Sequence, residues 1–279
     1  MITYPNIDPN IVSFSIGNLN LHIRWYGLFY VLSFILAFIL YKPFLKKRNI
    51  KLTKEQYESI IFYMMLGVIL GGRLGYILFY NLRYYLSHPI MIFAVWEGGM
   101  SFHGGALGVI IAGLIFCHKH KLNFYAMADS AIPIVAIGLG LGRLGNFINA
   151  ELYGKPTNLP WGMIFPGSDG AVRHPSQLYE LILEGIVMFV ITYFLLKKLK
   201  KEGVVFWSFI GLYGIFRFLI EFVREPDDLD FYTRSGYIFG FMSIGQFLSL
   251  LMMIIAIWGF YSIYKTPKKT NARSVTIKL

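Results

Sequence analysis

The amino-acid sequence predicts an all-α polytopic membrane protein of about seven transmembrane helices, forming a single domain over residues 1–279. The chain is 56% hydrophobic and only 15% charged, which is typical of proteins whose solvent is a bilayer. Apolar windows of roughly 20 residues, the length that crosses a bilayer, also recur along it. They cover about 19–41, 58–80, 100–117, 125–144, 177–196, 204–223 and 238–261.

Polar motifs bound the first four windows. The first begins near Arg24-Trp25-Tyr26, a composition typical of an interfacial anchor, and stops at a lysine cluster. The second and fourth end in the same Gly-Arg-Leu-Gly motif, around Arg73 and Arg143, and the third begins in a glycine-rich stretch around His103. We expect each of these motifs to lie at the membrane surface.

Prolines and charges bound the last three windows. Pro175 precedes the fifth, where a proline is compatible with the first turn of a helix. The sixth runs from lysines at 197–201 to an acidic stretch at 225–230, and the seventh ends at a basic tail, residues 262–279. Helices are expected throughout, because unpaired backbone groups are costly in hydrocarbon and the windows lack the alternation of a membrane barrel.

The distribution of basic residues predicts the orientation. Seventeen of the 26 lysines and arginines fall in 42–57, 118–124, 197–202 and the tail. Such clusters stay in the cytoplasm because they resist translocation, so the amino terminus is expected outside and the carboxyl terminus in the cytoplasm. The connection 145–176 would then lie outside, and its four prolines and several glycines predict an ordered cap.

Several classes of function are excluded. The net charge of +11 does not indicate a nucleic-acid partner, because the basic residues form short clusters between apolar windows. A single cysteine, Cys117, cannot form an intrachain disulfide. The motifs of zinc peptidases, P-loop proteins and serine hydrolases are absent from the sequence, so neither a metal nor a cofactor is expected.

The end of the fourth window combines glycines with polar side chains. Gly142 and Gly145 allow a ligand to approach the backbone, and Arg143 offers a planar fork of donors suited to a phosphate. The positions that follow are Asn146, Asn149, Glu151 and Gly154. The alternative is structural, with glycines that pack helices and an arginine that reaches the headgroups. The asparagines and the glutamate favour a ligand site.

Four glycines surround His103 just before the third window. Such a backbone bends tightly and exposes the imidazole, and histidine is the side chain best suited to proton transfer near neutral pH. A capping or interfacial histidine is the alternative interpretation.

The sixth window ends in a run of polar residues at helical spacing. Tyr213, Arg217, Glu221 and Arg224 fall on one face, where Glu221 can pair with either arginine. Two arginines for one glutamate leave positive charge over, and a buried surplus usually has a ligand. In the fifth window Glu180 and Glu184 lie one turn apart and need partners, and Asp129 in the fourth has no obvious partner in the sequence.

These motifs resemble the prolipoprotein diacylglyceryl transferases of bacteria. The family's Gly-Arg-x-Gly-Asn-Phe-apolar-Asn-x-Glu-x-x-Gly motif is matched at every fixed position from Gly142 to Gly154. Other similar blocks are Arg-Trp-Tyr at 24–26, Gly-Gly-Arg-x-Gly-Tyr around Arg73, Trp-Glu-Gly-Gly-Met-Ser-Phe-His-Gly-Gly at 96–105, His-Pro-Ser-Gln-Leu-Tyr-Glu at 174–180 and Tyr-Gly-x-x-Arg at 213–217. The resemblance extends from the first window to the sixth.

The resemblance implies an enzyme of the bacterial inner membrane with its active site toward the outer face. It would transfer the diacylglyceryl group of phosphatidylglycerol to the lipobox cysteine thiol of a prolipoprotein, forming a thioether and releasing glycerol phosphate. Its partners would be phosphatidylglycerol, the prolipoprotein signal peptide and the surrounding membrane lipid.

In this reaction we expect Arg143 and Arg217 to hold the phosphate and His103 to take the thiol proton. The positive potential of the arginines is an alternative activator of the thiol. Glu151 and Asn146 would orient the headgroup and the arginines. The other expected substrate-binding positions are Tyr26, Tyr213, Arg73, Asn149, Gly142, Gly145 and Gly154.

A transporter or lipid scramblase is the main alternative, because acidic residues inside apolar windows also occur in proton or solute paths. Transporter sites favour the bilayer midplane and broken helices, whereas the polar motifs of this chain gather at one face. A receptor or scaffold would leave the glycine-arginine and glycine-histidine motifs without a purpose.

Overall fold

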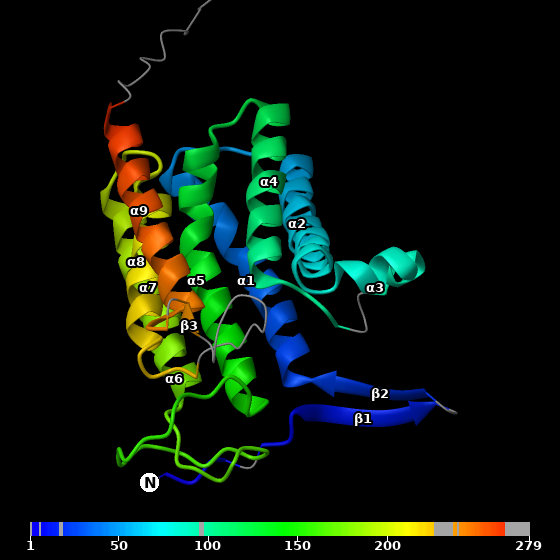
Figure 1. Ribbon diagram of the computed structural model, residues 1–279. Helices are drawn as coiled ribbons and strands as arrows, with labels where there is room; N and C mark the ends of the chain where they lie inside the picture. Colours follow the sequence, from blue (N-terminus) through cyan, green and yellow to red (C-terminus); the bar gives the residue numbers. More distant parts are fainter. Residues whose placement is uncertain are drawn as a thin grey trace, which may run out of the picture.

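Long parallel and antiparallel helices dominate the computed structural model, which describes residues 2–5, 7–16, 19–94, 98–225, 237–238 and 240–265 (Figure 1). The long helical segments are α1 (Trp25–Lys47), α2 (Lys54–Tyr80), α4 (Phe102–His120), α5 (Phe124–Ile148), α8 (Val204–Ile220) and α9 (Ile244–Lys265). One further segment consists of α6 (Ser176–Glu180), the π-helical stretch η3 (Leu181–Val187) and α7 (Met188–Lys198). All of these segments fall on predicted windows.

Among the described residues, five segments are long and apolar enough to cross a membrane: α1, residues 54–78 of α2, α5, the α6–α7 segment and α9. This confirms a mainly α-helical membrane protein. Helices α4 and α8 match the other two windows, so the count of seven spans stays a prediction, as does the side on which each terminus lies. The first residues and the end of α9 lie at opposite ends of the bundle (Figure 1).

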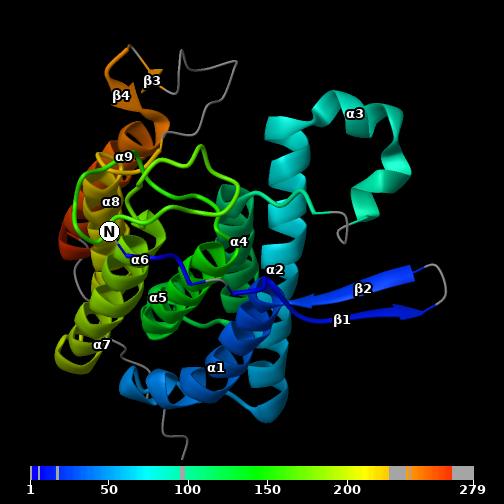
Figure 2. The same ribbon diagram turned by 90° about the horizontal axis from the view of Figure 1, so that it is seen from below.

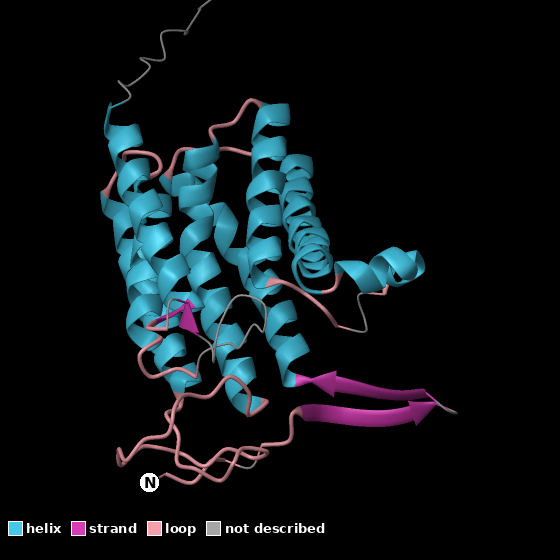
Figure 3. Cartoon of the chain, viewed as in Figure 1, coloured by secondary structure: helices cyan, strands magenta, loops and turns pink. Residues whose placement is uncertain are grey.

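The start of the first predicted window is wrong. Strand β2 (Leu19–Arg24) pairs antiparallel with β1 (Asn10–Ile16), and α1 begins only at Trp25 (Figure 3). The sequence of β2, Leu-Asn-Leu-His-Ile-Arg, alternates apolar and polar residues, which is the period of a strand. The window was assigned from its average hydropathy, which does not show this alternation.

The last window also starts too early. Two short strands, β3 (Tyr237–Ile238) and β4 (Met242–Ser243), precede α9. The Ser243 hydroxyl accepts a hydrogen bond from the Gln246 N–H, and the Gln246 side chain accepts one from the Ser243 N–H. This capping box sets the start of α9. The helix continues to Lys265, so the predicted tail loses its first four residues, and residues 266–279 lie outside the described residues.

Helices α2 and α4 pack through glycines. A Cβ on Gly71 would collide with the backbone of Gly104, and one on Gly108 with that of Gly67. Small residues allow such close approach between membrane helices. Beyond α2 the chain forms a short helix, α3 (Leu82–Ser87), and a 3₁₀ turn, η1 (Pro89–Phe93), which the sequence did not predict.

Asp129 has partners that the sequence did not reveal. Its carboxylate forms an ion pair with Arg48 (2.8 Å) and accepts hydrogen bonds from the backbone N–H groups of Gly203 (2.9 Å) and Phe206 (2.8 Å). A side chain of α5 thus caps the first turn of α8. Because the contacts join residues more than 70 positions apart, spacing could not predict them.

The connection from α5 to α6 is ordered. Single β-bridges join Pro156 and Met163 to Arg173, and Gly154 to Arg224 at the end of α8. An apolar cluster of Tyr4, Phe147, Met163 and Phe165 lies beneath it. The predicted cap is therefore a packed structure, which we call the cap, although its place outside the membrane stays a prediction.

Candidate active site

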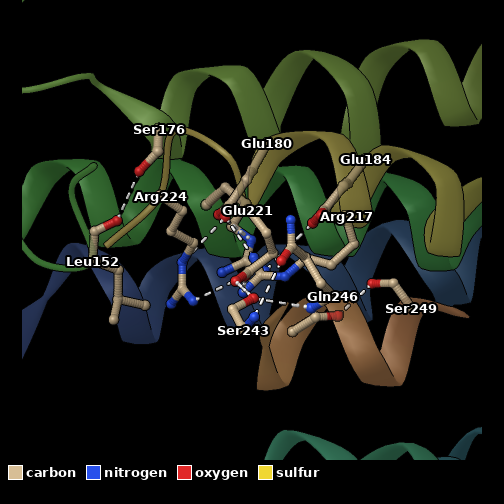
Figure 4. Close-up of polar contacts among 12 residues, drawn as sticks. Leu152, Ser176, Glu180, Glu184, Arg217, Glu221, Arg224, Ser243, Gln246 and Ser249 are labelled. Carbon is tan, nitrogen blue, oxygen red and sulfur yellow. Dashed lines mark hydrogen bonds and ion pairs between the residues drawn. The ribbon is translucent and has the colours of Figure 1, made fainter. Parts of the chain in front are cut away.

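Three arginines and three glutamates meet between α5, the α6–η3 segment and α8. Arg143 comes from the last turns of α5, and Glu180 and Glu184 come from α6 and η3. Arg217 comes from the last turn of α8, and Glu221 is the residue that follows this helix. Arg224 lies beyond the turn that follows α8. We call this set the arginine–glutamate cluster; Figure 4 shows all of its members except Arg143 as labelled sticks.

Glu180 lies at the centre of the cluster and has no exposed side-chain surface. Its Oε1 accepts a hydrogen bond from Arg217 Nη1 (2.6 Å) and lies 3.5 Å from Arg224 Nε, while its Oε2 lies 2.9 Å from Arg143 Nε. One carboxylate therefore draws three guanidinium groups together, which offsets much of their mutual repulsion.

Glu184 and Glu221 complete the charge balance. Glu184 accepts a longer hydrogen bond from Arg143 Nη2 (3.4 Å). Glu221 pairs with Arg217 Nη2 (2.6 Å) and Arg224 Nη1 (3.5 Å), the i,i+4 and i,i+3 pairs that the sequence predicted. The sequence predicted a surplus of positive charge at the end of α8. For the described residues this prediction is wrong, because Glu180 and Glu184 supply two further carboxylates from another segment.

The start of α9 closes one side of the cluster. Ser243, the capping residue, donates its hydroxyl proton to Glu221 Oε2 (2.6 Å) and is itself buried (Figure 4). Gly245 lies so near that a Cβ there would collide with the Glu221 carboxylate. The cluster thus depends on α9 as well as on the three segments that carry its charges.

The arginines are not sealed from their surroundings. The side chains of Arg143 and Arg217 keep 17% and 12% of their surface exposed, whereas Glu180 and Glu184 keep none. Part of each arginine side chain is thus accessible. An oxyanion could approach this accessible part without removing Glu180 from its place.

The two asparagines of the glycine-arginine motif hold Glu151. Asn146 Nδ2 donates to Glu151 Oε1 over 2.7 Å and Asn149 Nδ2 donates to the same oxygen over 3.2 Å. The Gln177 side chain also donates to the Glu151 carbonyl (2.7 Å). This carboxylate is exposed and stands just beyond α5, so the polar half of the motif forms a second anionic group near the cluster.

Each glycine of the motif has a different environment. A Cβ on Gly145 would press on the Tyr26 ring, and one on Gly154 would meet Val223 and His174, so both positions require close packing. Around Gly142 the described structure leaves open space. Gly142 is therefore the position whose backbone a ligand could approach, as the sequence predicted for this motif.

His103 and Arg73 come from the α2–α4 pair rather than from the segments of the cluster. His103 lies on the first turn of α4 with an exposed side chain, after the capping residue Ser101. Arg73 is buried, and its guanidinium donates to the carbonyls of Met91, Ile92 and Gly98. Trp96 and Glu97, the first two residues of the glycine-rich motif that contains His103, lie outside the described residues.

Sequence reasoning missed the polar contacts inside the cap. Arg173 binds Asp169 (2.9 Å) and Glu225 (2.8 Å), and the hydrogen bond from Arg173 lowers the pKa of the Asp169 carboxyl. Trp161 Nε1 donates to the Tyr179 hydroxyl, which lies 3.2 Å from His174 Nδ1. Burial lowers the pKa of His174. In the sequence, only the presence of His174 and Tyr179 in the same motif indicated such a contact.

An apolar groove of about 410 Å³ borders the cluster. Tyr179 and Val223 in its lining directly precede Glu180 and Arg224 in the chain. The other lining residues are Leu159, Trp161, His174, Leu183, Leu219 and Ile220. The apolar groove and the buried arginine–glutamate cluster therefore lie next to each other, an arrangement suited to a lipid with an anionic headgroup.

Comparison with known proteins identifies the family. The family described as prolipoprotein diacylglyceryl transferase matches residues 11–262. The chain belongs to this family. It is 53% identical to the phosphatidylglycerol–prolipoprotein diacylglyceryl transferase of Geobacter sulfurreducens, over 91% of this chain and 94% of the relative.

Other members of the family give the same result. The enzymes with that name from Bordetella parapertussis and Legionella pneumophila are 49% and 46% identical, over 91% and 92% of this chain and 94% and 98% of their own lengths. The resemblance drawn from the motifs is confirmed, and the transporter and scaffold alternatives lose their support.

Proposed function

We propose that the chain transfers the diacylglyceryl group of phosphatidylglycerol to the thiol of a prolipoprotein's lipobox cysteine. The sulfur forms a bond to the glyceryl carbon that carries the phosphate, and the bond from that carbon to the phosphate oxygen breaks. The electron pair leaves on the oxygen as glycerol phosphate, and the thiol proton passes to a base. The product is a thioether.

The leaving group makes the main demand on the site. As the carbon–oxygen bond breaks, negative charge grows on the phosphate, and donors placed in advance stabilise it. The accessible Arg143 and Arg217 side chains carry the donors that we assign to this task. Glu180 holds them at fixed positions, so little reorganisation is needed when the lipid binds.

The acyl chains need an apolar path next to those donors. The groove supplies one, because Tyr179 and Val223 in its lining are the chain neighbours of Glu180 and Arg224. We assign the groove to hydrocarbon of the lipid donor or of the lipidated product. The cap then lies over the headgroup, on the outer face of the bacterial inner membrane.

The thiol needs activation, since a free cysteine has a pKa of about 8.5. His103 is exposed on α4 and stays our candidate for the base, with the positive potential of the arginines as the alternative. If His103 is the base, His103→Gln removes the acidic limb of the pH profile. An unchanged rate and an unchanged profile would assign activation to the arginines.

The observation that carries the proposal is the three-arginine cluster built around a buried glutamate in a chain of this family. It is tested by incubating purified protein with phosphatidylglycerol and a synthetic lipobox peptide, followed by mass spectrometry. We expect a diacylglyceryl mass gain on the cysteine, lost in Arg143→Ala and kept in Arg83→Ala, an exposed arginine outside the cluster. No gain with folded wild-type protein would contradict the proposed reaction.

A further inference from the structure

Glu151 lies in a strained turn that directly follows α5. The helix ends in a Schellman motif. The Ala150 N–H donates to the Phe147 carbonyl (3.0 Å), and the next N–H along the chain donates to the Asn146 carbonyl (3.1 Å). Ala150 holds the left-handed position of this motif with a φ of 53°, and Leu152 is left-handed as well, with a φ of 58°. A side chain makes this conformation costly, so it persists only where the surroundings hold it. We call residues 150–152 the Glu151 turn.

Helix α6 lies beside the end of α5 (Figure 2), and its first residues hold the Glu151 turn. Gln177 Nε2 donates to the Glu151 carbonyl (2.7 Å). The Ser176 hydroxyl donates to the Leu152 carbonyl (3.0 Å), a bond drawn in Figure 4. These two carbonyls belong to the peptide groups on either side of Leu152, so the bonds fix the two planes that set its left-handed conformation. Both Gln177 and Ser176 are fully buried.

The amide of Gln177 is only partly satisfied. Its Oε1 is buried and has no hydrogen-bond partner among the described residues, although buried polar atoms are usually paired. Turning the amide over would place Oε1 against the Glu151 carbonyl, which is also an acceptor, so the bond to the turn fixes the orientation. Methionine has a similar length and would fill this space without an unpaired oxygen. The residue type therefore suits the donor that the turn needs better than it suits the packing of α6.

Glu180 lies on the same helix, three residues after Gln177. Three residues advance an α-helix by about 4.5 Å, which is less than one turn. Glu180 in its turn contacts the guanidinium groups of Arg143 (2.9 Å) and Arg217 (2.6 Å). Helix α6 therefore attaches the Glu151 turn at its start and the arginine–glutamate cluster at its end, so the two are held at a fixed separation.

We propose that Gln177 and Ser176 are positioning residues, which keep the Glu151 carboxylate in register with the arginines by holding the Glu151 turn. The inference rests on the proposed function, because it requires that Glu151 orients a headgroup whose phosphate the arginines bind. Without either bond, Leu152 can relax to an ordinary conformation and carry the carboxylate out of place. A misplacement of about 1 Å can lower a rate by roughly 10²-fold. The lipid would still bind through the arginines, so the loss falls mainly on kcat.

The test compares substitutions that each remove one bond to the Glu151 turn. Gln177→Met removes the donor and keeps the length of the side chain, and Ser176→Ala removes only the hydroxyl. Thr192→Val is the matched control, because this threonine is also fully buried and, among the described residues, its hydroxyl bonds only the Met188 and Phe189 carbonyls of its own helix. Initial rates with phosphatidylglycerol and the lipobox peptide, followed by mass spectrometry, give kcat and the Michaelis constant for the lipid.

We expect kcat to fall by roughly 10–100-fold in Gln177→Met and to a smaller extent in Ser176→Ala, with little change in Thr192→Val. Leu152→Gly separates positioning from packing. Glycine adopts the left-handed conformation without a Cβ penalty, so in the Gln177→Met background it should restore part of the lost kcat. Leu152 is 41% exposed, so its side chain contributes little to the packing of α6.

An unchanged kcat in both Gln177→Met and Ser176→Ala would overturn the proposal. So would a loss that Leu152→Gly leaves unrepaired, because Gln177 would then act through the packing of α6. If Gln177→Met does not fold, the same comparison is made with Ser176→Ala. A folded wild-type protein that leaves the peptide unmodified would contradict the proposed function, and this inference with it.

Discussion

Two clusters of buried charge lie toward opposite ends of α5 and use their arginines differently. At Asp129 the arginine and carboxylate are 2% and 0% exposed, and two backbone N–H groups complete the carboxylate's hydrogen bonds. In the arginine–glutamate cluster the carboxylates meet mainly guanidinium groups, and the Arg143 and Arg217 side chains keep 17% and 12% of their surface exposed. A cluster closed on itself holds helices together, whereas one that leaves arginine side chains accessible can also bind an anion.

The comparison predicts different consequences for substitution at each end. Breaking a buried ion pair leaves a charge without a partner, which costs stability. Removing an accessible donor instead removes an interaction with the ligand or with the transition state. Stability and turnover should therefore separate between the two clusters.

The largest effect is expected from Asp129→Ala, which leaves Arg48 buried and uncaps α8. We expect a loss of roughly 3–5 kcal/mol in the free energy of unfolding, measured in detergent. Turnover per folded molecule should stay near the wild-type value. A selective loss of turnover with unchanged stability would show that this end of α5 serves the reaction.

Arg143→Lys comes next, because lysine keeps the charge but loses the planar fork. Turnover with phosphatidylglycerol should fall by roughly 10²–10³-fold, the usual effect of losing a placed donor. The melting temperature should fall less than with Asp129→Ala, because lysine still supplies a positive charge to the buried Glu180 and Glu184, and Arg83→Lys should be without effect. Undiminished turnover would remove Arg143 from the phosphate site.

Ser243→Ala should have a smaller effect. It removes the hydroxyl bond to Glu221 and part of the capping box of α9, and a hydrogen bond to a charged group contributes about 1.5–3 kcal/mol. We expect turnover to fall and the Michaelis constant for the lipid to rise. Ser243→Thr, which keeps a hydroxyl, should restore both values. Ser249→Ala is the matched control, since that hydroxyl bonds only the Gly245 carbonyl of its own helix among the described residues. Equal effects of the two alanine variants would contradict a link through Glu221.

The smallest effect concerns the cap. The pKa of His174 is lower in the folded protein than in the unfolded chain. As the pH falls from the unfolded pKa toward the folded one, the unfolded chain therefore binds more protons, and the free energy of unfolding decreases. The melting temperature should therefore decline modestly below about pH 6.5, the ordinary value for histidine. His174→Gln should flatten this decline, and an identical pH dependence in the variant would assign it to other groups.

The sequence predicted what is local and missed what is tertiary. The pairs of Glu221 with Arg217 and Arg224 follow from helical spacing, and the helices follow from hydropathy. The contacts of Glu180 with Arg143 and Arg217 join residues 37 positions apart, and no single-sequence pattern links them. The β1–β2 pair was lost because a window of average hydropathy does not distinguish an alternating strand from the start of a helix.

The position of Glu180 has a further consequence for how the chain is made. An arginine or glutamate alone in a bilayer costs about 2.5–3.5 kcal/mol during insertion, and Arg143 is synthesised well before Glu180. Helix α5 is therefore expected to stay near the insertion machinery until α6 is synthesised. The two segments are then expected to remain there until α8, which carries Arg217, has also been synthesised. The cluster would assemble only after the last of these helices enters the membrane, so a truncated chain would hold unpaired charges that quality control can recognise.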